Sequence, residues 1–308
     1  MKFHVPLPGN NHIPGYAEWI PKLQAPDWQT IAAVIDECGY DAISTSEHIA
    51  MPDYERDRLG GWWMHALTVM AFICGATKNT RVDTSVLVLP YHHPVALAKA
   101  IATMDVLSGG RVNVSIGVGH AVQEFKVLNV PFDDRGPRTD EMLDAMLAFW
   151  ASSEPVFHGR FFDIEGVISD PRPIQLPHPP IIVGGNSKAA MRRASRYQGW
   201  IPNPLTITGD ELPPQIEFIK SQPTFGDPSR PFDISLGVRG LGDRAWPKFR
   251  AMSGADKSSL KEYLVDMIGK LGANGVNVTS VPPLPTESVD EYCDSLRWVA
   301  QEVVAACR

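Results

Sequence analysis

The chain lacks the features that mark metal-binding, secreted, membrane and nucleic-acid-binding proteins. Its 308 residues include four cysteines, all far apart and none in a C-x-x-C pair, so the sequence indicates neither a zinc site nor a disulfide framework. No apolar run approaches the roughly 18 residues of a membrane helix, and the apolar start at 3–7, broken by proline, is too short for a signal peptide. A net charge of −7 argues against nucleic acid or an anionic membrane as a partner. We therefore expect a cytoplasmic protein without a metal ion that acts on a small molecule.

A complete dinucleotide-binding fingerprint is also absent. The stretch VNVSIGVGHAVQEF at 112–125 begins as a strand, and Gly117 and Gly119 supply the first half of G-x-G-x-x-G. The third glycine would fall at position 122, which is Val122. A strand that ends in Gly-Val-Gly and is followed by His120 is therefore expected to serve a purpose other than binding a pyrophosphate in a Rossmann fold.

Short apolar runs alternate with amphipathic helical patterns along the chain. The runs are rich in β-branched residues, as strands of a parallel sheet buried on both faces are. Eight such strands with helical connections predict a single (β/α)8 TIM-barrel domain over 1–308; an open doubly wound sheet is the alternative, but it usually needs fewer units and a better glycine fingerprint. The first helix is expected to be capped by Asp27 and to end at Gly39. The strands are expected at 3–7, 42–47, 82–89, 112–118, 181–184, 200–201, 234–238 and 276–280.

Two long segments interrupt this alternation. Residues 152–180 contain Phe157-His158-Gly159-Arg160 and then a proline-rich stretch, which predicts an insertion after the fourth unit with a hairpin that turns at His158-Gly159. Residues 202–232 also hold many prolines and turn residues. They are expected to form a second long loop, on the catalytic face or on a partner surface.

The ends of the second and third strands carry histidines. In a TIM barrel the active site lies at the carboxyl ends of the strands. Glu47 and His48 are neighbours and point to opposite faces of a regular strand, so only one of them can face the pocket. His48 is the better candidate for acid–base or hydrogen-bonding chemistry near neutral pH, and a loop histidine bonded to backbone is the alternative. His92 and His93 also point apart, which argues against a shared metal ion.

Two tryptophans and a glycine-rich turn are further candidates. Trp62 and Trp63 either line an aromatic pocket or begin the core face of the following helix. Later, a buried strand ends in Gly184-Gly185, after which Asn186 or Ser187 is expected to cap a helix. Free backbone N–H groups, a hydroxyl and the positive helix end favour a phosphate there, and an ordinary turn with a good cap is the alternative.

Several segments together resemble the bacterial luciferase-like monooxygenase superfamily. The resemblance is good over about residues 39–200 and weaker over 233–308, and its specificity comes from the order and spacing of LSGGR, GVG and the acidic Glu124-Phe125. The segments are GYDAISTSEH (39–48), VLVLPYHHPVALAKAIATMDVLSGGRVNVSIGVG (86–119), EFKVLNVPFDDRGPRTDEMLDAM (124–146) and PRPIQLPHPPIIVGGNSKAAMRRASRYQGW (171–200).

This resemblance implies a TIM barrel that binds FMN or the deazaflavin coenzyme F420, with the insertion after the fourth unit. It places a non-proline cis peptide bond at Ser85–Val86, under the flavin ring. It also brings the backbone of Gly117 and Gly119 close to the cofactor, and the turn Gly184-Gly185-Asn186-Ser187 resembles the family's phosphate-binding segment. Many members dimerise, so a homodimer is expected.

The resemblance also assigns roles to the histidines. In deazaflavin-using relatives the histidine at the end of the second strand approaches the reactive face of the ring, and His48 holds that position here. Ser-Glu-His at 46–48 and Ser-Val at 85–86 favour the deazaflavin branch, although the FMN branch shares the barrel and the glycine segments. Relatives frequently carry Trp, Ser or a catalytic Glu where this chain has His120. Glu124 lies four residues further on and is not expected to reach the same place.

The sequence therefore predicts a coenzyme F420-dependent oxidoreductase that transfers hydride between the deazaflavin ring and a small or medium organic substrate. His48 is expected to exchange a proton, His120 to be a second donor or a substrate contact, and Trp62 and Trp63 to shape the pocket. An FMN-dependent monooxygenase is one alternative. A flavin-binding protein without turnover is the other, because the fold does not oblige activity.

Overall fold

A computed structural model describes the whole chain except residues 15–16, 204–206, 208–210, 228, 238–256 and 281–285. The described residues group into two compact units. The terminal unit comprises Met1–Gly9, Gly15–Ser44 and Ile182–Arg308, and the central unit comprises Asn10–Pro14 and Thr45–Ile181. The expectation of a single domain stays a prediction.

The terminal unit is built on parallel strands. β1 pairs with β3, Phe3 forms a parallel bridge to Val278 of β13, and from β13 the parallel order continues through β12 and β11 to β10. Phe3 and Trp200 are fully buried, as expected for strands that are covered on both faces. The strands are β1 (His4–Pro6), β3 (Ala42–Thr45), β10 (Ile181–Gly184), β11 (Gly199–Ile201), β12 (Asp233–Gly237) and β13 (Val276–Ser280).

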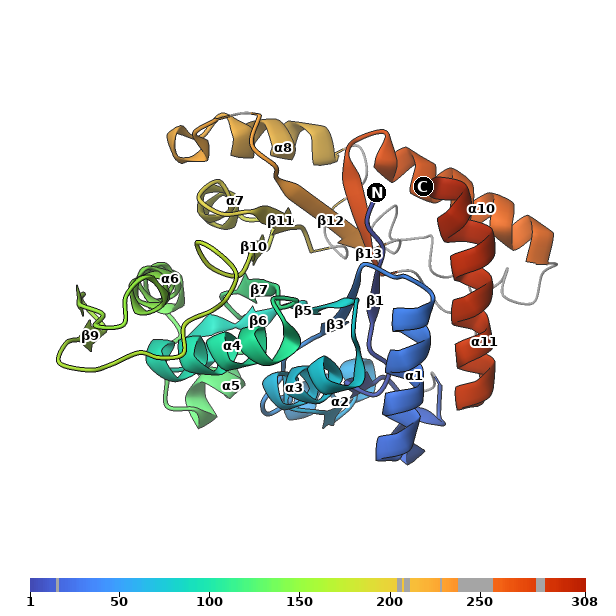
Figure 1. Ribbon diagram of the computed structural model, residues 1–308, viewed down its shortest axis with the longest axis horizontal. Coiled ribbons are helices and arrows are strands. Elements are labelled where there is room, and N and C mark those ends of the chain that lie inside the picture. The colour runs from blue at the N-terminus through green and yellow to red at the C-terminus, as the bar shows by residue number, and fades with distance from the viewer. Residues whose placement is uncertain (15–16, 204–206, 208–210, 228, 238–256, 281–285) are drawn as a thin grey trace. The chain divides into compact units, whose positions relative to one another are not determined.

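Helices pack on this sheet, and α1 lies beside α11 (Figure 1). The first helix begins before the predicted cap: Asp27 is the third residue of α1, and its carboxylate accepts the N–H of Gln24 at 2.7 Å. The reason is a reciprocal capping arrangement, which satisfies N–H groups that the first turn leaves free. The helices are α1 (Ala25–Glu37), α7 (Lys188–Ala194), α8 (Leu212–Lys220), α10 (Lys257–Gly272), α11 (Val289–Val299) and α12 (Ala305–Cys307), with a π turn at Ala300–Val304 and 3-10 turns at Ile20–Lys22 and Pro223–Phe225.

The central unit contains the strands expected at 82–89 and 112–118. β6 pairs in parallel with β7, and Val82 of β5 forms a parallel bridge to Val112. The predicted cis peptide bond is present at Ser85–Val86 and separates β5 from β6. α4 lies between α3 and α6 (Figure 1). The elements are β5 (Arg81–Thr84), β6 (Leu87–Val88), β7 (Val114–Gly117), α2 (Arg56–Leu59), α3 (Ala66–Ala76), α4 (Pro94–Ser108), α5 (Val122–Val127) and α6 (Arg135–Ala151), with 3-10 turns at Asp53–Glu55 and Leu89–Tyr91.

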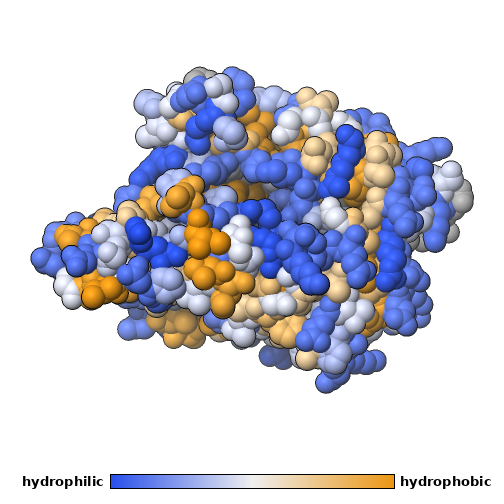
Figure 2. Space-filling model, in the orientation of Figure 1, coloured by the Kyte–Doolittle hydropathy of each residue, from blue (hydrophilic) through white to orange (hydrophobic). Residues whose placement is uncertain are grey.

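Two short antiparallel pairs complete the central unit. β8 (Phe157–His158) pairs with β9 (Asp163–Ile164), which confirms the hairpin predicted at His158-Gly159. β2 (Asn11–His12) pairs with β4 (Trp62–Trp63), which the sequence did not predict. Hydrophobic residues are exposed on the face seen in Figure 2. In the segments that flank the β8–β9 hairpin, the exposed large hydrophobic residues are Val156, Val167, Ile168, Ile174 and Leu176.

All eight predicted strands are therefore present in an α/β fold with parallel pairing. The last residue of the strand expected at 234–238 lies outside the described residues, as do 204–206, 208–210 and 228 of the expected loop at 202–232. That segment is not one loop, because it contains α8, which two prolines begin where their missing N–H groups cost nothing. None of the helices among the described residues has an apolar stretch long enough to cross a bilayer.

Candidate active site

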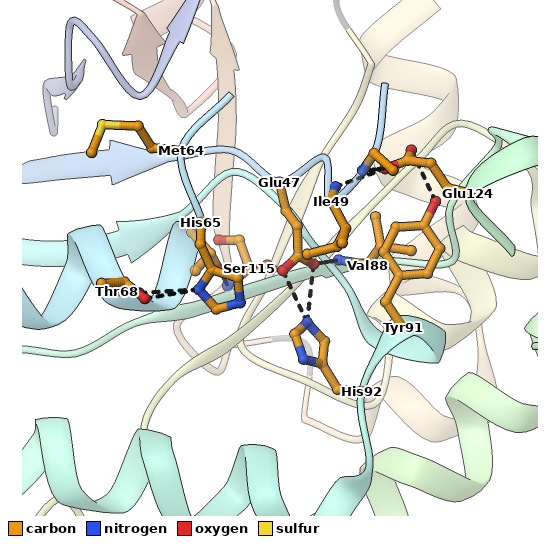
Figure 3. A network of polar contacts seen from close by, with 12 residues as sticks. Glu47, Ile49, Met64, His65, Thr68, Val88, Tyr91, His92, Ser115 and Glu124 are labelled. Atoms are coloured by element: carbon orange, nitrogen blue, oxygen red, sulfur yellow. Dashed lines mark hydrogen bonds and ion pairs between the residues drawn. The ribbon is translucent and has the colours of Figure 1, made fainter. Parts of the chain in front are cut away.

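Two carboxylates, Glu47 and Glu124, lie buried in the central unit and each contacts a histidine. Glu47 is 4% exposed and Glu124 is fully buried. A buried charge is tolerated where it is paired and hydrogen-bonded. Both carboxylates meet this condition (Figure 3).

Glu124 is held by four hydrogen bonds. Its Oε2 lies 2.6 Å from Nδ1 of His48 and accepts the hydroxyl of Tyr91 at 3.1 Å. Its Oε1 accepts the N–H groups of Ile49 at 2.7 Å and Ala50 at 3.1 Å. Burial alone would raise the pKa of Glu124, but the hydrogen bonds from His48 and from these backbone N–H groups hold the pKa below its ordinary value. Glu124 is therefore ionised at neutral pH.

The ionised carboxylate decides which nitrogen of His48 carries the proton. A carboxylate only accepts hydrogen bonds, so Nδ1 of His48 donates to Glu124 and Nε2 is left as the second site of the ring. Among the described residues Nε2 has no hydrogen-bond partner. An imidazole that is oriented by a carboxylate through one nitrogen is suited to take or give a proton at the other.

His120 lies close to His48, as two predicted catalytic residues should. The two ring centroids are 5.8 Å apart and the rings are nearly perpendicular. Partial burial, and then the charge of His48, lower the pKa of His120, which is therefore neutral at neutral pH. The catalytic roles of both histidines stay predictions.

Glu47 has a different function from Glu124. Its carboxylate lies 2.9 and 3.1 Å from Nε2 of His92 and accepts the N–H of Val88 at 2.8 Å, so it fixes the short strand β6 that follows the cis bond. Glu47 and His48 do point to different partners, but β3 ends at Thr45, so the alternation of a regular strand is not the reason. His92 and His93 also point in different directions. His92 contacts Glu47, whereas the ring of His93 lies 5.7 Å from that of Phe162. No cluster in the described part of the chain has the groups to hold a metal ion.

The two tryptophans lie in β4 and do not begin a helix. α3 begins at Ala66 and His65 caps it, so the interpretation of Trp62 and Trp63 as the start of a helical core face is wrong. The ring of Trp63 lies 4.5 Å from that of His48. Its Nε1 is buried and has no hydrogen-bond partner among the described residues. An unpaired buried donor beside His48 is a group available to a ligand.

Gly117 and Gly119 are required by packing. A Cβ at Gly117 would lie 2.9 Å from Cγ2 of Val86, and a Cβ at Gly119 would lie 2.6 Å from Cγ1 of Val88 and 2.9 Å from Cε2 of Phe125. Gly119 also has a φ of +77°, which disfavours other residues. The glycines thus let β6 and β7 approach each other. Their contact with a cofactor, like that of Ser85 and Val86, stays a prediction.

The predicted phosphate-binding turn belongs to the terminal unit. Ser187 caps α7, and its Oγ accepts the N–H of Ala190 at 3.1 Å. Asn186 instead binds the backbone of Asn203, accepting its N–H at 2.7 Å and donating to its C=O at 3.1 Å. Ser187 is therefore the cap, and phosphate binding at Gly184, Gly185, Asn186 and Ser187 stays a prediction.

Sequence reasoning missed the carboxylates. Glu124 was not expected to reach the site, yet it does, because α5 begins only at Val122, after the chain has turned at Gly119. The spacing alone could not show this turn. Glu47 was identified only as the residue that points away from the pocket, and nothing in the sequence pairs it with His92.

The chain is similar in sequence to several curated proteins. An FMNH2-dependent dimethylsulfone monooxygenase of Pseudomonas putida is 33% identical over 138 residues, which cover 44% of this chain and 38% of that protein. An F420-dependent glucose-6-phosphate dehydrogenase of Amycolatopsis mediterranei is 27% identical over 231 residues, 72% of this chain and 68% of that protein.

Structure comparison gives the same fold. A monooxygenase from Streptomyces bottropensis matches with a TM-score of 0.74 and 20% identity over 99% of both chains. The family model described as luciferase-like monooxygenase matches residues 1–241. The chain therefore belongs to the luciferase-like monooxygenase family.

Proposed function

We propose that this protein is a coenzyme F420-dependent oxidoreductase that acts on a small or medium organic substrate. The observation that carries the proposal is the contact between Glu124 and Nδ1 of His48, which leaves Nε2 of His48 free for proton exchange. The proposed fold is a closed (β/α)8 barrel with the insertion at 152–180 after the fourth unit. The protein is proposed to be a cytoplasmic homodimer.

The residues present fit a ligand with polar atoms at this place. The rings of Trp63 and His48 contact each other. The unpaired Nε1 of Trp63 can donate a hydrogen bond, and the free Nε2 of His48 can exchange a proton. Ser85 and Val86, at the cis bond, and the backbone at Gly117 and Gly119 are proposed to line the ring, and Gly184, Gly185, Asn186 and Ser187 to bind the phosphate.

A deazaflavin held at this site would supply or accept a hydride at its ring carbon. The protein supplies the accompanying proton: Nε2 of His48 gives it to a substrate carbonyl oxygen on reduction, or takes it from a hydroxyl on oxidation. Glu124 stabilises the imidazolium that forms in the second case. His120, with its lowered pKa, is proposed to hydrogen-bond the same substrate oxygen.

An FMN-dependent monooxygenase is the second candidate, because the Pseudomonas putida relative with 33% identity carries that activity in its name. The longer match is to the F420-dependent relative, which covers 72% of the chain, and it supports the first candidate. A flavin-binding protein without turnover is the third.

Titration of the apoprotein with coenzyme F420 and with FMN separates the candidates. Saturable F420 binding, followed by oxidation of reduced F420 with a panel of carbonyl compounds, supports the proposal. Binding of FMN alone overturns it, and binding without turnover on a broad panel favours the third candidate.

The role of His48 is tested by His48→Ala, which should keep the fold and lose most turnover. His158→Ala is the control, because His158 lies on the exposed β8–β9 hairpin. Unchanged activity in His48→Ala contradicts the assignment.

A further inference from the structure

Three arginines gather where α6 begins and the β8–β9 hairpin turns. Arg135 and Arg138 lie in the first turns of α6, and Arg160 lies in the turn of the hairpin. We call Arg135, Arg138 and Arg160 the arginine cluster. No step of the proposed reaction uses it.

A glutamate side chain on α6 holds the turn of the β8–β9 hairpin in place. One carboxylate, that of Glu141, accepts the N–H groups of Arg160, Phe161 and Phe162 at 2.9, 2.6 and 2.8 Å. A Cβ at Gly159 would lie 2.2 Å from Oε1 of Glu141, so a larger residue there would displace this carboxylate. The hairpin turn is therefore held in a defined conformation, and the carboxylate of Glu141 is already occupied by backbone N–H groups.

Aromatic rings orient the guanidinium groups. The ring of Phe161 lies between two of them, with Cζ of Arg138 at 4.6 Å and Cζ of Arg160 at 4.7 Å from its centroid. Cζ of Arg135 lies 3.7 Å from the ring centroid of Phe132. Such stacking fixes the plane of a guanidinium and leaves its N–H groups pointing outward from the ring edge.

Most of these N–H donors are unused. Arg138 makes no hydrogen bond or ion pair among the described residues, and its buried Nε lacks a partner. The Nε of Arg135 is buried and unpaired as well. Arg160 has only a long ion pair to Asp134, at 3.8 Å. Buried donors without partners are rare in folded proteins, and Arg135 and Arg138 each present one here, beside the exposed guanidinium of Arg160.

The cluster adjoins the candidate active site through direct contacts. His92 binds Glu47, and the next residue, His93, packs its ring against Phe162, which also contacts Arg138. A second connection follows aromatic rings: Phe125 lies 5.0 Å from Tyr91, which binds Glu124, and 5.1 Å from Phe132, on which Arg135 stacks.

We propose that the arginine cluster binds the glutamate carboxylates of the cofactor's tail. This inference rests on the proposed function. Coenzyme F420 carries a long anionic tail with a phosphodiester and glutamate carboxylates, whereas FMN ends in one short phosphate. Planar guanidinium groups match such oxygens with paired hydrogen bonds. The start of α6 adds a partial positive charge. Because Asp133 and Asp134 lie beside the cluster, recognition comes from these short-range hydrogen bonds and not from overall charge.

The test compares coenzyme F420 with its tail-free deazaflavin riboside on the wild type and on Arg138→Met and Arg160→Met. Methionine is unbranched and apolar, like the stem of arginine, and removes the charged donors. Arg172→Met is the matched control, since Arg172 is exposed and its ion pair to Asp170 spans 4.0 Å. Binding is followed by deazaflavin fluorescence, and thermal unfolding checks that the variants fold.

Arg138→Met should weaken F420 binding about tenfold or more, as expected for losing hydrogen bonds to a charged group, and leave riboside binding unchanged. Arg160→Met should act in the same direction and Arg172→Met should have no effect. Equal F420 affinity in Arg138→Met and the wild type overturns the inference and leaves the proposed function intact. The same holds if the wild type binds riboside and F420 equally well. If the wild type binds neither deazaflavin, both proposals fail.

Discussion

At the scale of single residues, the geometry of the candidate site depends on the position of one carboxylate, that of Glu124. Glu124 gathers His48, Tyr91 and two backbone N–H groups around it, and these bonds keep it ionised despite complete burial. His48 at a strand end could be predicted from the sequence because parallel strands present their carboxyl ends to a common site. Glu124 could not, because its approach depends on the backbone turn at Gly119.

Glu124→Gln should lower turnover roughly a hundredfold or more, within the range that general acid–base groups contribute. The amide keeps the shape of the carboxylate but removes the charge that stabilises protonated His48. Steady-state oxidation of reduced F420 measures this, with cofactor affinity as the second readout. Exposed Glu154→Gln is the control, and a turnover equal to that of the wild type in Glu124→Gln would falsify the role of the pair.

Trp63→Phe tests whether Nε1 of Trp63 contributes to ligand binding or to the stability of the fold. An aromatic ring is kept beside His48, although a smaller one, and the buried Nε1–H without a partner is removed. An unsatisfied buried donor costs about 1–3 kcal/mol, so the free variant should be as stable as the wild type or more stable in urea unfolding. Its affinity for cofactor or substrate should fall about tenfold. Lower stability with unchanged affinity would show that Trp63 is only a packing residue.

At the scale of elements, the strands were predictable because burial on both faces produces uninterrupted apolar runs. The pairing of β2 with β4 was not, since two-residue strands leave no periodic pattern and their partners, Asn11–His12 and Trp62–Trp63, are far apart in sequence. α8 was not predicted, because the prolines near its start indicated a loop. Local pattern thus identifies buried elements and misses those that depend on a distant partner.

The contact between β5 and β7 predicts an unusual dependence of stability on pH. The hydroxyl of Ser115 donates to Asp83 at 2.8 Å, and burial raises the pKa of Asp83 to about 7. Between the ordinary pKa near 3.8 and about 7, the unfolded chain loses a proton that the folded protein keeps. Asp83 therefore contributes stability at low pH that is lost as the pH rises through this window, by a few kcal/mol at most.

Asp83→Asn removes this titration. Between about pH 4.5 and about pH 7.5, the unfolding free energy of the variant should rise relative to that of the wild type. Urea unfolding at these two pH values measures the change. A difference that is the same at both would mean that Asp83 does not titrate in this window.

At the scale of the whole molecule, cofactor choice should be visible in thermal unfolding. A ligand that binds only the folded protein stabilises it by about 2.7 kcal/mol at a hundredfold excess over Kd. F420 should therefore raise the Tm by several degrees, and FMN at the same concentration should raise it less. A larger shift with FMN would favour the monooxygenase interpretation.

The close approach of β6 and β7 limits which substitutions positions 86 and 117 can accept. The space that a side chain at Gly117 would need is occupied by Val86, one of the two residues at the cis bond. Neither position is free to change size alone. Among relatives, and in any redesign of this contact, position 117 should gain a side chain only where the side chain at position 86 has become smaller.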